Sequence, residues 1–171
     1  MAARNSVDLD SDPRAMVGMR EFDAPRELVW TAWTDPKHLS QWWGPDEFTT
    51  TTSAFDMRPG GVWRFIMHGP DGRDYENRVT FDEIVKPERL VYHHGGGDGV
   101  EPVQFRTTVT FEDLGDRRTR VTLRGVFPSA EERARVIKEY GADKGLVQTL
   151  SRLGDYVAKL AGERSIDRSA P

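Results

Sequence analysis

The sequence predicts a single α+β domain in which a curved antiparallel sheet of about six to seven strands wraps around a long C-terminal helix. Apolar and polar residues alternate through the middle of the chain, and glycine- and proline-rich turns separate these stretches. One apolar stripe at helical spacing follows them. A sheet with one apolar face must be covered, and only the last segment is long enough to cover it.

The amino-acid composition limits the classes of protein to which the chain can belong. The chain has 171 residues, of which 37% are hydrophobic and 30% charged, as expected of a folded domain with a real core. The formal net charge of -4 argues against a nucleic-acid partner. The absence of cysteine excludes disulfides and thiolate metal sites, so a reducing, cytoplasmic location is expected.

The two ends of the chain are expected to be tails. Residues 1–13 have no apolar segment of the kind found in a secretory signal, and residues 162–171 are polar. No apolar run approaches the roughly 20 residues that a membrane span needs. We therefore expect a single domain over residues 14–161, flanked by flexible segments and without a membrane span.

The order of elements begins with a strand over residues 15–22. Two short helices follow, over residues 25–34 and 36–43, and each has proline near its first turn. Asp35 caps the second helix, and Gly44-Pro45 ends it. Alternation then predicts hairpin-connected strands near residues 63–68, 75–82, 90–94, 105–112 and 120–127.

A long helix is expected to close the chain. Ser129 and Glu132 form a capping box at its start, and it runs to about residue 160. Its apolar stripe consists of Leu146, Leu150, Leu153, Val157 and Leu160. Gly141 and Gly145, one turn apart, indicate either a break near residue 141 or a place where another group approaches the helix backbone.

Four segments carry a resemblance to a known family: REFDAPRELVWTAWTDPKHLSQWWGP (20–45), DMRPGGVWRFIMHGPDG (56–72), IVKPERLVY (84–92) and KGLVQTLSRLGDYVAKL (144–160). In these the chain resembles bacterial proteins grouped as homologues of the activator of heat-shock protein 90 ATPase, within the START-like, or SRPBCC, superfamily. The resemblance implies a helix-grip fold with a cavity between the sheet and the long helix. In the superfamily this cavity often holds an apolar ligand.

The expected lining of that cavity comes from inward positions of the sheet, the second short helix and the last helix. Small-molecule pockets are mostly apolar with a few placed polar groups. The candidate residues are Trp43, Trp63, Phe65, Met67, Tyr75, Asn77, Phe81, Tyr92, His94, Phe105, Val109, Gly145, Leu146 and Leu150.

The polar members of this set leave alternatives open. Asn77 lies in the apolar phase of its strand, where a buried amide needs partners, and it is either a structural amide or a ligand-orienting group. Tyr75 and Tyr92 carry the same two interpretations. If Leu90 and Tyr92 face inward, so does His94, as a strand-end residue, a polar handle or a general base.

The adjacent tryptophans at positions 42 and 43 raise a question of orientation. Leu39 and Trp43 are four residues apart and share a helix face, so Trp43 is expected to point inward at the cavity rim. Trp42 is expected on another face, sealing a seam or partly exposed. The alternative interpretation is that both tryptophans are core residues that close one end of the grip. With four scattered histidines and no cysteine, neither a metal site nor a cofactor is expected.

Three hypotheses of function follow. The first is a binding module for a small hydrophobic or amphipathic molecule. The second, from the resemblance alone, is a co-chaperone-like module with a protein partner of chaperone type. The third is a cyclase or hydrolase-type enzyme, which would need at least two of Asn77, Tyr92 and His94 to converge on one point.

Overall fold

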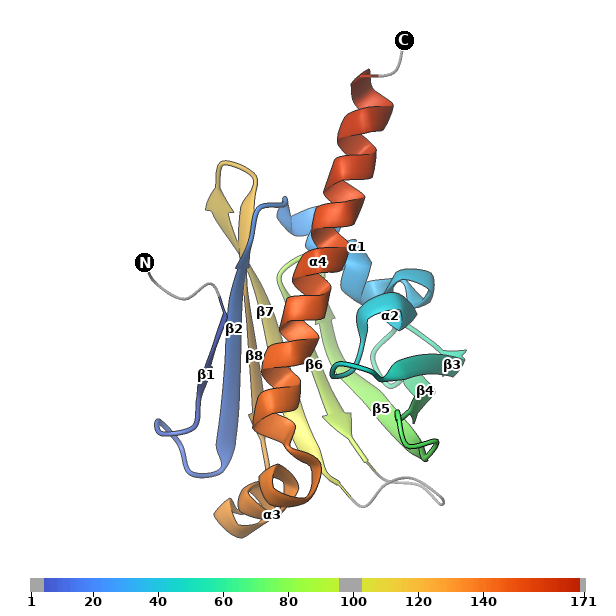
Figure 1. Cartoon of the computed structure of the whole chain (residues 1–171). Helices are drawn as coiled ribbons and strands as arrows, with labels where there is room; N and C mark the ends of the chain where they lie inside the picture. Colours follow the sequence, from blue (N-terminus) through green and yellow to red (C-terminus); the bar gives the residue numbers. More distant parts are fainter. Residues whose placement is uncertain (1–4, 96–102, 170–171) are drawn as a thin grey trace.

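A single antiparallel sheet lies against one long helix in the computed structural model, which describes residues 5–95 and 103–169 (Figure 1). The sheet has eight strands in the order β1-β2-β8-β7-β6-β5-β4-β3. The strands are β1 (Asn5–Asp8), β2 (Ala15–Phe22), β3 (Thr49–Phe55), β4 (Val62–His68), β5 (Asp74–Val85), β6 (Arg89–His94), β7 (Phe105–Gly115) and β8 (Arg118–Val126). The helices are α1 (Arg26–Thr34), α2 (Pro36–Trp42), α3 (Ala130–Tyr140) and α4 (Ala142–Ser169). The predicted architecture is confirmed.

Connectivity explains how the sheet closes on the helix. From β3 to β8 each strand pairs with the next along the chain, and β8 then pairs with β2. Along β5 and β7 the buried residues recur at every second position, so one face of the sheet is apolar. That inner face packs against α4, while α2 packs against β3 and α1 against β7 and β8 (Figure 1).

The C-terminal segment forms two helices instead of one. Ser129 caps α3 by accepting a hydrogen bond from the backbone N–H of Glu132. Gly141 adopts a left-handed conformation with φ of 62°, which glycine tolerates, and this ends α3. Of the two sequence-based alternatives, the break near residue 141 is therefore the one observed. A Cβ on Gly145 would lie 3.7 Å from Pro45, an ordinary contact, so nothing presses on the helix there.

The apolar stripe of α4 meets the sheet as expected. Leu146, Leu150, Leu153 and Val157 are each 8% exposed or less. The approach is closest at Gly18 of β2, where an added Cβ would lie 2.7 Å from Leu146. None of the described helices is long and apolar enough to cross a membrane.

Both ends of the chain contain more structure than the expected tails. Residues 5–8 form β1, an edge strand that pairs with β2, and Asn5 donates hydrogen bonds to the Val147 carbonyl and the Ser151 hydroxyl of α4. The sheet therefore has eight strands where six to seven were expected. The sequence pattern identified neither β1, whose polar sequence NSVD carries no apolar signal, nor β3, whose sequence TTTTSAF is mostly polar. At the other end, α4 continues through residue 169.

The close approach at Gly18 yields a first prediction. Gly18→Ala should lower the free energy of unfolding by about 1–3 kcal/mol, because the new methyl group overlaps Leu146 in a packed interior. Gly125→Ala on the adjacent strand β8 is the matched control, since its Cβ would meet nothing nearer than 3.7 Å. Urea unfolding of both variants measures the difference, and equal losses would contradict the close contact.

Candidate functional site

A buried polar pair lies at the ends of β5 and β6. Asn77 is 7% exposed and His94 is 8% exposed. His94 Nε2 lies 2.6 Å from Asn77 Oδ1, and His94 Nδ1 lies 3.1 Å from the carbonyl oxygen of Val103. Asn77 Nδ2 donates to the carbonyl of Tyr75 at 2.9 Å. Two of the three polar residues named for an enzyme therefore converge, and both ring nitrogens of His94 already have partners.

The surroundings of His94 are aromatic. Its ring stacks on Phe105 with centroids 4.8 Å apart and an interplanar angle of 7°, and Phe105 in turn packs against Phe127 at 5.3 Å. Burial lowers the pKa of His94, and the contact with the Val103 carbonyl opposes only part of that shift. The imidazole is therefore neutral near neutral pH. The neighbouring His93 is exposed on the outer face, 2.9 Å from Asp82.

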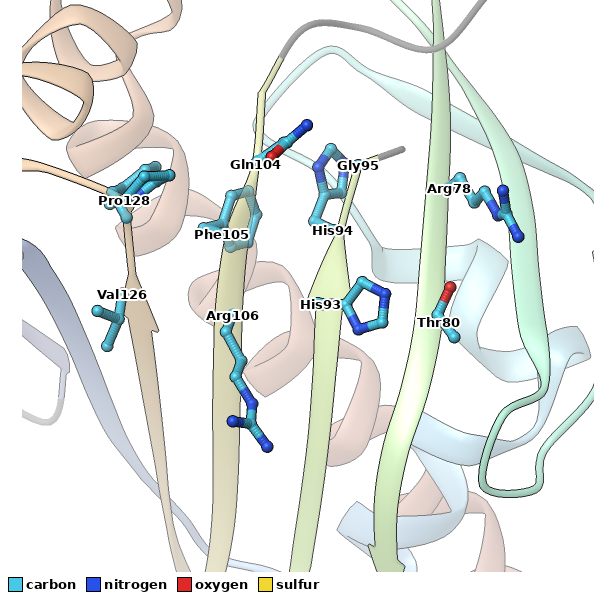
Figure 2. A pocket seen from close by; sticks show the side chains of 11 residues that line it. Arg78, Thr80, His93, His94, Gly95, Gln104, Phe105, Arg106, Val126 and Pro128 are labelled. Carbon is cyan, nitrogen blue, oxygen red and sulfur yellow. The ribbon is translucent and has the colours of Figure 1, made fainter. Parts of the chain in front are cut away.

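A pocket of about 440 Å³ opens at this end of the sheet (Figure 2). Outward residues of β5, β6 and β7 form one side of it, and the strand ends with their inward residues form the other. Its lining is Arg78, Thr80, His93, His94, Gly95, Gln104, Phe105, Arg106, Val126, Phe127 and Pro128.

The pocket combines two kinds of surface. Phe105, Val126, Phe127 and Pro128 supply apolar area, and Arg78, Arg106 and Gln104 supply cationic and amide groups. Arg106 Nε is 3.7 Å from Asp82, a loose exposed pair of little energetic weight. Such a lining can hold a molecule with an apolar body and a polar or negatively charged end.

Most of the predicted cavity residues lie elsewhere, in the core. Each of the following is 8% exposed or less: Trp63, Phe65, Phe81, Tyr92, Val109, Leu146 and Leu150. The Trp63 and Phe65 rings stack 3.8 Å apart, and burial raises the pKa of Tyr92. Met67, Tyr75 and Gly145 are half-buried and away from the pocket. Only His94 and Phe105 of the predicted set line it, with Asn77 directly behind His94.

The two tryptophans differ from the expectation in which ring is the more deeply buried. Trp42 is the buried member, 1% exposed, and its Nε1 donates to the Ala32 carbonyl at 2.9 Å. Trp43 is half-buried and follows the last helical residue, with extended backbone (φ -62°, ψ 134°). The four-residue helical spacing from Leu39 therefore does not apply to Trp43. Its ring nevertheless packs against the inner face of the sheet, edge-on to Trp63 of β4 at 5.0 Å.

The outer side of the pocket was not predicted from the sequence. The patterns of the sequence assign no role in a site to Arg78, Gln104 or Arg106. Strand register is the missing information, because Thr80 pairs with His93 and His93 with Arg106, which places all three in one row across the sheet. A sequence pattern within one strand does not contain that row.

A second hollow, of about 510 Å³, runs between α2 and the edge strand β3. It is lined mainly by hydroxyl side chains and contains none of the predicted residues. Ser40 and Thr52 lie 3.1 Å apart there, and Thr52 also accepts a hydrogen bond from the Trp63 indole at 3.0 Å. These hydroxyls therefore tie α2 to the sheet, which is a structural role.

An open antiparallel sheet that grips a long C-terminal helix defines the helix-grip class of α+β proteins. The comparison with known families then identifies the group within that class. The chain belongs to the family described as Activator of Hsp90 ATPase homolog 1-like protein, whose model matches residues 23–158. The resemblance seen in the sequence motifs is thereby confirmed.

Solved structures share this fold. A protein from Arthrobacter aurescens, determined by NMR, is 29% identical with a TM-score of 0.83, over 92% of this chain and 93% of that one. Protein Ms6760 from Mycobacterium smegmatis is 26% identical with a TM-score of 0.76, over 91% and 94% of the two chains. CalU16 from Micromonospora echinospora, 18% identical over 98% and 94% with a TM-score of 0.59, shares the fold alone. No curated protein matches the chain.

The different environments of the two tryptophans give a second prediction. Trp42→Ala should lower the free energy of unfolding by about 3–5 kcal/mol, because it empties a fully buried site and orphans the Ala32 carbonyl. Trp43→Ala should lower it by no more than about 2 kcal/mol, since part of that ring is already in water. Denaturant unfolding compares the two, and a larger loss for Trp43→Ala would contradict the assignment.

A third prediction concerns pH. Because the folded-state pKa of His94 lies below the unfolded value of about 6.5, the unfolded chain binds more protons as pH falls through that value. The free energy of unfolding should therefore decline on acidification, by at most about 1.4 kcal/mol per pH unit from this residue. His94→Gln should flatten the decline between about pH 7 and 5, and His93→Gln, at an exposed position, should leave the contribution of His94 in place. Unchanged slopes in His94→Gln would refute the assignment.

Proposed function

We propose that the protein is a binding module for a small amphipathic molecule, which it holds in the pocket at the ends of β5 to β8. The single observation that carries the proposal is the meeting of the Phe105–Phe127 aromatic surface with Arg78 and Gln104 in one hollow of about 440 Å³. An apolar body can stack on the aromatic side while a polar end meets the cationic side.

The packing of the core favours the strand-end pocket as the ligand site, in preference to a cavity in the middle of the sheet. The predicted cavity residues there pack against one another and against α4 as one core cluster. Phe105, in contrast, is half-buried, with one side on His94 and Phe127 and the rest of its surface toward the pocket. A ligand would bury that remaining apolar area, which is favourable by roughly 25 cal/mol per Å².

The two other hypotheses have less support. A general base must reach a proton of the substrate, and both nitrogens of His94 lie against protein atoms, of Asn77 and Val103. A chaperone partner, which the family description brings to mind, would be favoured by a large exposed apolar patch. Within residues 5–95 and 103–162, Tyr140 is the one large hydrophobic side chain in the exposed class.

The proposal predicts the outcome of a binding experiment. Small amphiphiles such as 2-naphthoate, 2-naphthamide and decanoate are titrated into the protein by isothermal calorimetry, with thermal shift as a second readout. At least one should bind, and Phe105→Ala should weaken that binding about tenfold or more, because the stacking surface is lost.

Phe55→Ala is the matched control. Phe55 is another half-buried strand aromatic, which packs against Trp63 and Phe81 and does not line this pocket. Its removal should lower stability without changing ligand affinity. Failure of every compound to bind, or equal losses of affinity in the two variants, would refute the proposed site.

A further inference from the structure

We propose that the strand-end pocket binds an anionic amphiphile together with one proton, which His94 takes up. The inference rests on the proposed function and adds the charge of the ligand and the protonation state of the site. It starts from the hydrogen-bond partners of the His94 ring, which are unusual for a neutral imidazole.

Both ring nitrogens of His94 face oxygen acceptors. Nδ1 faces the carbonyl oxygen of Val103, and Nε2 faces Oδ1 of Asn77. A neutral imidazole has one N–H, so it can donate to only one of the two oxygens. The other contact then sets a lone pair against a lone pair. An imidazolium has two N–H groups and satisfies both contacts.

Turning the Asn77 side chain around does not remove the conflict. Its Nδ2 would then donate to His94 Nε2, but its Oδ1 would face the carbonyl oxygen of Tyr75, which Nδ2 now approaches to 2.9 Å. Because a backbone carbonyl only accepts hydrogen bonds, the mismatch would move from His94 to Tyr75. One of these buried contacts is therefore unsatisfied until the ring gains a proton.

In the protein without ligand, protonation of His94 is unfavourable. His94 is buried, and the other ionisable groups among the described residues of the pocket are Arg78 from β5, His93 from β6 and Arg106 from β7. The segment after β8 contributes the apolar Phe127 and Pro128. No carboxylate belongs to the described lining, and Asp82 lies outward beside His93 and Arg106. Hydrogen bonding favours the imidazolium, while desolvation by burial opposes it.

An anion bound in the pocket lowers the free-energy cost of placing a positive charge on His94. A carboxylate bound in the pocket that His94 lines would offset the positive charge of the imidazolium. The ligand stays ionised, and the proton comes from solvent and forms the second N–H bond of His94. Anion and proton thus enter together, and the charge of the complex equals that of the free protein.

Calorimetry with a matched pair of probes tests the inference. 2-Naphthoate and the neutral 2-naphthamide are titrated at several pH values between about 6 and 8, in two buffers with different heats of ionisation. Naphthoate binding should take up close to one proton, and its affinity should rise about tenfold for each pH unit of acidification. Naphthamide should bind with little proton uptake and a flat pH dependence.

Variants assign the proton to its site. His94→Gln should abolish the proton uptake, while His93→Gln, which removes an exposed imidazole beside the same pocket, should preserve it. Asn77→Asp sets a fixed negative charge against Nε2, so His94 should hold its proton before the ligand arrives and uptake should fall. The ring resonances of His94 in the unsubstituted protein give a readout that needs no variant. They should move toward imidazolium values when naphthoate is added at about pH 7.

The outcomes separate this inference from the proposed function. Naphthoate binding without proton uptake, or with uptake that persists in His94→Gln, would overturn the inference and leave the binding pocket intact. Equal binding of naphthoate and naphthamide at every pH would do the same. If neither probe binds, the proposed function and the inference fall together.

Discussion

The burial of one face of the sheet under α4 is the constraint on which the rest of the structure depends. Leu150 and Leu153 are fully buried, and Gly18 lets the helix approach β2 more closely than any side chain would allow. Arg152 of α4 donates to the carbonyls of Gly44 and Pro45, which fixes the turn after α2 relative to the same helix. The helix therefore positions both the sheet and the aromatic cluster around Trp43.

Helix α4 does not cover the strands of the sheet evenly along their length. Gly141 turns α3 away from the axis of α4, at the end of the sheet where β6 finishes and β7 begins (Figure 1). Phe127 and Pro128 lead from β8 into α3 and line the pocket there. The glycine that breaks the C-terminal segment and the pocket thus occur at the same end of the fold. Polar side chains tolerate this region better than the centre of the sheet, because water and backbone carbonyls are within reach.

Local periodicity determined how much of this arrangement could be predicted. The order of elements, the apolar stripe of α4 and the family motifs all followed from patterns within single segments. Strands β1 and β3 were missed because their mostly polar residues carry no such pattern. Trp42 and not Trp43 is the deeply buried tryptophan, and α2 ends one residue before Trp43. The pocket depends on which residues of β5, β6 and β7 stand side by side, and that register is a property of the sheet and not of any one strand.

Asn77 is the position at which the sequence pattern and the structure together say most about the site. An amide in the apolar phase of a strand breaks the local pattern, and such breaks concentrate at functional or strained sites. The structure supplies its partner, but the pair with His94 is satisfied only in part while the ring is neutral. An apolar pair at these positions would avoid the penalty of an unmade buried hydrogen bond, about 1–3 kcal/mol. A protein that keeps the polar pair has a site whose hydrogen bonding is completed by a proton, and a proton at such depth needs a counter-ion, which the pocket is open to receive.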